Sequence, residues 1–83
     1  MIFVGLKHGN PSEVFRSRNT PTESSHGQQY FAAIGPFRTV RGATFMALFG
    51  NNNPHCQTVY QAEELGKQYG VSKEQKEKAK AKT

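Results

Sequence analysis

The sequence has no tryptophan and no aspartate, and it has a single cysteine, Cys56, in 83 residues. One cysteine cannot form a disulfide within the chain. This favours a reducing compartment and predicts a cytoplasmic location, with a bridge between two chains as the alternative. Without aspartate, any chemistry that needs a carboxylate must use one of the six glutamates. No catalytic constellation or cofactor motif stands out, so we expect a protein that is not an enzyme and uses no cofactor.

Long apolar runs are also lacking. No stretch approaches the roughly 20 apolar residues of a membrane span. The apolar segment 1–6 is short, has no positive charge before it and is followed by Lys7, unlike a targeting segment. We therefore expect no membrane partner. A chain of 83 residues suffices for one small domain with a thin core. We place this single globular domain at residues 1–71, followed by a lysine-rich tail at residues 72–83.

The net charge of +5 is unevenly distributed. Residues 1–71 carry six basic and four acidic side chains, a net of +2, whereas residues 72–83 carry five lysines and two glutamates, a net of +3. A basic chain is a candidate for binding nucleic acid. Because more than half of the excess charge lies in the tail, the domain itself is only mildly basic.

Alternating apolar residues predict three strands. Residues 2–7 put their even-numbered side chains on one face, and a turn separates them from a β-like segment at 13–17, so the two are expected to form a hairpin. Arg16 and Arg18 are expected to point to solvent from an edge strand, where charge discourages the addition of further strands.

Residues 29–34 are apolar on both faces. A strand of this type lies in the middle of a sheet or is covered on both sides, so we expect it to be the central strand. The pair Gly35-Pro36 is expected to end it, because proline cannot donate a hydrogen bond to a neighbouring strand. The polar residues 18–27 predict either one helical turn or an extended surface loop.

A helix is predicted at residues 40–49. Thr39 is a natural N-cap, because its hydroxyl can accept a hydrogen bond from the first turn. Gly42 weakens that turn by about 1 kcal/mol relative to alanine, or it allows a close approach of a strand or ligand. Gly50 is expected to adopt the left-handed conformation after the last turn, followed by an asparagine-rich stop.

The second predicted helix begins with a capping box, in which Thr58 and Gln61 satisfy each other's backbone amides, and it ends at Gly70. The tail at 72–83 has a third candidate cap at Ser72 but no apolar stripe. Nothing in the pattern drives it onto the core, and we expect a frayed helix or disorder.

These elements predict an α+β fold: a small three-stranded antiparallel sheet with two helices on one face, in the order β-β-β-α-α. Such a thin core leaves apolar surface for a partner chain, so a homodimer is a reasonable expectation. The side chains expected to form most of the core are Phe3, Val4, Tyr30, Ala32, Ile34, Val40, Ala43, Met46, Ala47, Val59, Ala62 and Leu65.

The string GPFRTVRGATFM, followed by NNNPHCQTV and AEEL, resembles small uncharacterised proteins of phages and prophages. The resemblance covers roughly residues 14–66 and leaves out the first strand and the lysine tail. It implies a context, that of a phage accessory or virion protein in the host cytoplasm, and it implies no activity.

The start of the helix at 40–49 is a candidate anion site. Free backbone amides and the helix dipole attract negative charge there, and Arg38, Thr39 and Arg41 flank the same point. The alternative is ordinary capping by Thr39 beside two solvated arginines. The remaining basic candidates are Arg16, Arg18, Lys73, Lys76 and Lys78, and the tail lysines are equally typical of a solubilising end.

Two other kinds of site have weaker patterns. His8, His26, His55 and Cys56 match no zinc-ligand spacing, so we expect no metal. A nuclease-like site built from His26, Asn53 and His55 has no aspartate to support it. Phe37, Phe45, Phe49 and Tyr60 could stack nucleic-acid bases, although in so short a chain aromatic residues more often form the core.

Two functions follow from these patterns. The first is a non-enzymatic module that contacts nucleic-acid backbone through a helix N-terminus and a lysine tail. The alternative is a phage protein-interaction or assembly module, or an inhibitor of a host protein, which the nearly balanced charge of residues 1–71 favours.

Overall fold

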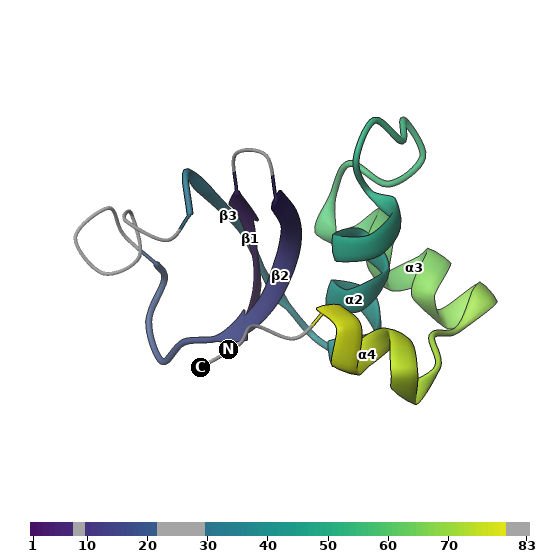
Figure 1. The fold of residues 1–83 in the computed structure, drawn as a ribbon. Helices are drawn as coiled ribbons and strands as arrows, with labels where there is room; N and C mark the ends of the chain where they lie inside the picture. The colour runs from purple at the N-terminus through teal and green to yellow at the C-terminus, as the bar shows by residue number, and fades with distance from the viewer. Residues whose placement is uncertain (8–9, 22–29, 80–83) are drawn as a thin grey trace.

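The computed structural model describes residues 1–7, 10–21 and 30–79, and over these residues it shows a three-stranded antiparallel sheet and three helices (Figure 1). This confirms the predicted α+β class and strand number, with one helix more than expected. The strands are β1 (Ile2–Lys7), β2 (Asn10–Arg16) and β3 (Ala32–Phe37). The helices are α2 (Val40–Phe49), α3 (Val59–Tyr69) and α4 (Lys73–Ala79).

The strand order is β2-β1-β3, and both neighbours of β1 are antiparallel to it. The expected hairpin of the first two strands is confirmed. The expectation that residues 29–34 form the central strand is wrong, because β1 is central and β3 is an edge. Ala32 and Ala33 are exposed, whereas Phe3 and Val4 of β1 are buried on opposite faces of the sheet.

The pair Gly35-Pro36 does not end β3 but lies inside it. Ile2 pairs with Phe37 and Val4 with Ile34, so β3 has one residue more than β1 across this interval, which is a β-bulge. Proline is tolerated there because a bulge on an edge strand needs no donor at that position.

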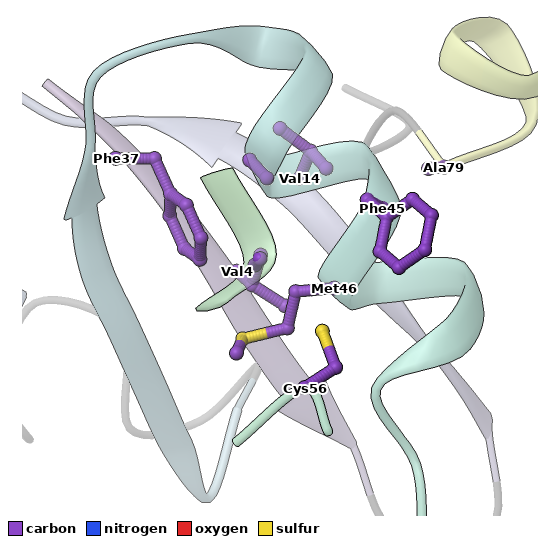
Figure 2. Close-up of a cluster of buried hydrophobic side chains, with 9 residues drawn as sticks. Val4, Val14, Phe37, Phe45, Met46, Cys56 and Ala79 are labelled. Carbon is purple, nitrogen blue, oxygen red and sulfur yellow. The ribbon is translucent and has the colours of Figure 1, made fainter. Parts of the chain in front are cut away.

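The two faces of the sheet carry different side chains. Val4, Val14 and Phe37 belong to a buried cluster shared with the three helices (Figure 2). On the opposite face the Phe15 ring stacks on Phe3, with centroids 5.8 Å apart, and on Tyr30, with centroids 4.9 Å apart. The alternation predicted for residues 2–7 therefore separates a mixed apolar face, covered by the helices, from an aromatic one.

Helix α2 lies between the sheet and the other two helices, which both contact it. Residues 42–46 are all buried, so this helix is enclosed on nearly every side. Gly50, expected to be left-handed, has φ −80°, and the positive φ falls on Asn52 instead. The capping box of Thr58 and Gln61 at the start of α3 is confirmed.

The core differs from the predicted set at several positions. Phe3, Val4, Tyr30, Ala43, Met46 and Ala62 are buried as expected. Ala32 is exposed because β3 is an edge strand. Val14, Phe37, Phe45, Cys56 and Ala79 are buried in addition.

The beginning of the predicted tail is ordered as α4. Ser72 and Gln75 cap it reciprocally, with nitrogen–oxygen distances of 2.8 and 3.1 Å. The helix contacts α2 and β2, and Ala79 joins the buried cluster. The expectation that nothing drives these residues onto the core is wrong, because Val71 before the helix and Ala79 at its end both pack against the buried cluster. The predicted turn at residues 18–27 lies largely outside the described residues.

Candidate nucleic-acid interface

The start of α2 is capped as its sequence predicts. The Gly42 amide donates to Thr39 Oγ1 at 3.0 Å, and Thr39 itself has the extended backbone of an N-cap residue. One of the amides at this helix end is therefore satisfied within the chain.

A carboxylate from α3 lies at the predicted anion site. The Thr39 amide donates to Glu63 Oε1 at 3.2 Å, and Thr39 Oγ1 donates to Glu63 Oε2 at 3.1 Å. The negative charge also lies at the positive end of the α2 dipole, where it is stabilising. The prediction of an open anion site at this helix N-terminus is thus wrong, because the chain supplies its own anion.

Two glycines let the carboxylate reach this position. A Cβ atom on Gly42 would collide with the Glu63 carboxylate, and one on Gly66 would lie 3.3 Å from Gly42 Cα. The helices α2 and α3 therefore cross with their backbones nearly in contact. Of the two readings of Gly42 from sequence, the close approach is correct, and the approaching group is a neighbouring helix.

The two arginines beside this helix end differ in environment. Arg38 is exposed, whereas Arg41 is half-buried and its Nε atom is buried without a hydrogen-bond partner among the described residues. Because Glu63 fills the position between the amides, Arg38 and Arg41 do not border an empty anion site. Arg38 is left as a surface cation next to the end of the sheet.

Three arginines lie near one end of the sheet. Arg16 and Phe37 both pair with Ile2, so Arg16, Ile2 and Phe37 form a row across the three strands. Strands are spaced by about 4.8 Å, which places the Arg16 and Phe37 backbones about 10 Å apart. Arg38 follows Phe37 directly, and Arg18 follows the end of β2. All three arginine side chains are exposed.

Helix α4 brings lysines to the same end. It contacts β2, and Figure 1 shows its last turn on the side of the sheet where the chain begins and where β3 leads into α2. Lys76 and Lys78 are exposed in that turn. We call Arg16, Arg18, Arg38, Lys76 and Lys78 the basic end. Lys73 lies at the other end of α4, about 9 Å away along the helix axis.

The basic end has no acidic partner in the part of the chain that the structure describes, where Lys7–Glu13 is the one ion pair, at 2.8 Å. Glu74 and Glu77 of α4 are exposed and make no ion pair within these residues. The side chains of the basic end therefore present their charge to solvent, an arrangement that attracts an anionic ligand.

A polar group on the aromatic face was not predicted from sequence. Tyr30 Oη donates to Glu13 Oε2 at 3.0 Å, and Lys7 Nζ lies 5.8 Å from the centre of the Tyr30 ring. Burial, reinforced by the hydrogen bond and by the charge of Glu13, raises the pKa of Tyr30 to about 12. The phenol stays protonated at neutral pH and keeps its hydrogen bond to Glu13. Tyr30, Glu13 and Lys7 therefore form a hydrogen-bonded group on the aromatic face.

The members of the weaker candidate sites that the structure describes do not form a metal cluster. Asn53 donates to the Phe49 carbonyl at 3.1 Å and accepts from the His55 amide at 3.0 Å, so its side chain shapes the turn after α2. His55 is exposed and Cys56 is buried, and burial raises the pKa of the Cys56 thiol. His8 and His26 lie outside the described residues. Among those described, no three metal-ligating side chains gather.

No helix in the described ranges is both long and apolar enough to cross a membrane. Comparison of the chain with known protein families, curated proteins and solved structures gives no significant match.

Proposed function

We propose that this protein is a non-enzymatic module that binds the phosphate backbone of nucleic acid through the basic end. The observation that carries the proposal is the gathering of exposed cations from three separate segments at one end of the sheet, without acidic partners among the described residues. Guanidinium and ammonium groups bind phosphate through charge-assisted hydrogen bonds. The start of α2 takes no part, because the Glu63 carboxylate already lies there and would repel a phosphate.

The test is an equilibrium titration of the protein with labelled single-stranded DNA, RNA and duplex DNA at two salt concentrations. Binding that weakens steeply with salt supports backbone contacts, because each neutralised phosphate releases counterions. The variants Arg16→Glu and Lys78→Glu should each weaken binding severalfold and reduce the salt slope.

Lys67→Glu is the matched control. It changes the net charge by the same amount at an exposed position of α3, a helix that contacts α2 and β3 but neither β2 nor α4. It should change the affinity much less than Arg16→Glu. Equal losses of affinity in all three variants would show that only the net charge matters, which contradicts a binding site at the basic end. Absence of binding at low salt would contradict the proposal as a whole.

The resemblance to phage and prophage proteins gives the setting, that of a small accessory protein in a host cytoplasm. The rival function is a protein-interaction module or a host inhibitor. The exposed aromatic residues favour it, Tyr60 above all, with 74% of its surface accessible. In that case a protein partner should bind wild type and Arg16→Glu alike, with little dependence on salt.

A further inference from the structure

Three aromatic rings lie together where α2 meets the end of α3. The Phe45 ring belongs to the core and packs against two exposed rings, with its centroid 4.9 Å from that of Phe49 and 6.4 Å from that of Tyr69. The Tyr69 ring is within 19° of parallel to that of Phe45. We call these residues the aromatic row.

The aromatic row has one buried ring that packs in the core and two rings that are exposed to solvent. Phe45 is buried in the core cluster, while Phe49 is 44% and Tyr69 70% exposed. One face of the Tyr69 ring packs towards Phe45, so much of the ring is left accessible to a flat ligand. A ring fixed by packing is a good stacking platform, because little conformational freedom is lost when the ligand binds.

Helix α4 connects the aromatic row to the basic end. Lys73, its first residue, is four residues after Tyr69, which limits the backbone separation to about 14 Å. From there the helix runs to β2, and its last residue, Ala79, lies in the same buried cluster as Phe45 (Figure 2). The lysines of α4 therefore lie between the aromatic row and the arginines of the sheet.

We propose that the ligand of the basic end is a single-stranded nucleic acid, whose backbone follows α4 and one of whose bases stacks on Tyr69. The inference rests on the proposed function and adds the strand type. Phosphates bind either form through charge, but only an unpaired base can place its face on an exposed ring. In a duplex the base faces are covered by their neighbours.

The test compares binding of a labelled thymidine oligonucleotide with binding of a duplex of the same length, at one salt concentration. The wild type should prefer the single strand. Tyr69→Ala should weaken single-strand binding about five- to 150-fold, the range for loss of one stacked base, and should leave duplex binding unchanged. Tyr69→Phe keeps the ring and should bind like the wild type.

Tyr60→Ala is the matched control. Tyr60 is also an exposed tyrosine of α3, but it lies nine residues before Tyr69, which at about 100° per residue places it on the opposite side of the helix. It should bind within about twofold of the wild type.

The outcomes separate this inference from the function on which it rests. If binding is salt-dependent and sensitive to Arg16→Glu but Tyr69→Ala binds normally, or if the duplex binds as tightly as the single strand, the inference is wrong and the proposed function stands. If neither nucleic acid binds at low salt, both are wrong.

Discussion

On the helix-covered face of the sheet, Val4, Val14 and Phe37 join Met46 in one mixed apolar cluster, whereas on the opposite face the Phe15 ring stacks on Phe3 and Tyr30. The two sides also differ in whether their buried polar atoms have hydrogen-bond partners. The aromatic face pairs its buried phenol with Glu13, while α2 carries a fully buried hydroxyl, that of Thr44, without a partner among the described residues.

The difference shows which contacts fix the arrangement of side chains on each face. Packing in this mixed apolar cluster tolerates exchange of similar volumes, so the helix-covered face is positioned chiefly by contacts between helices, including the crossing at Gly42 and Gly66. Stacked rings and a phenol–carboxylate hydrogen bond admit fewer arrangements. The aromatic face should therefore respond more sharply to small changes in shape.

The largest expected effect is that of Gly5→Ala on the aromatic face. The added Cβ would lie 2.6 Å from Tyr30 Cγ, and the buried ring has little room to move, so the free energy of unfolding should fall by about 3 kcal/mol. Urea unfolding measures this change. In a Tyr30→Ala background the same substitution should cost much less. An equal cost in both backgrounds would show that the ring is not the obstacle.

On the helix-covered side, Glu63→Ala should lower the free energy of unfolding by about 2 kcal/mol. It removes two hydrogen bonds and leaves the Thr39 amide and hydroxyl without their acceptor. Glu64→Ala, at the exposed neighbouring position, should change stability by less than about 0.5 kcal/mol. Comparable losses from the two variants in thermal unfolding would contradict capping of α2 by Glu63.

Tyr30→Phe tests the polar part of the aromatic face and should destabilise the protein by about 1–2 kcal/mol at neutral pH. Because the pKa of Tyr30 is about 12 when folded and about 10 when unfolded, the unfolded chain loses the proton first. The stabilisation is therefore complete below pH 10 and is lost as the pH rises towards 12. Urea unfolding of both proteins across this range should show their difference shrinking, and a constant difference would contradict the shift.

What the sequence predicts correctly is mostly local. Thr39 and Thr58 cap helices because their hydroxyls reach amides three residues away, and the alternation of residues 2–7 sorts side chains onto two faces whatever lies next to them. The turn before β2 is followed by an adjacent antiparallel strand, as short connections usually are. These signals are sufficient for the α+β class and for the bounds of β1, α2 and α3, whereas β2 and β3 each begin about three residues from their predicted starts.

What the sequence does not predict depends on partners far along the chain. Glu63 reaches Thr39 across 24 residues, and Tyr30 reaches Glu13 across 17, and neither pairing leaves a periodic signal. The edge position of β3 depends on which strand pairs with β1. The docking of α4 depends on Val71 and Ala79, two small apolar residues at either end of a lysine-rich segment. Of the candidate site, the exposed cations were predicted individually, but their gathering at one end of the sheet follows only from the strand register.

The smallest expected effect is a gain in stability on the helix-covered side. Thr44 is fully buried, and its hydroxyl has no hydrogen-bond partner in the described part of the chain. Valine has nearly the same shape and a similar helix propensity, so Thr44→Val should raise the free energy of unfolding by about 1 kcal/mol by removing a desolvated polar atom. Thr44→Ser keeps the hydroxyl, removes the methyl group and should destabilise. A lower melting temperature for Thr44→Val would mean that the Thr44 hydroxyl has a hydrogen-bond partner. The helix-covered side would then resemble the aromatic face, where the buried phenol is hydrogen-bonded.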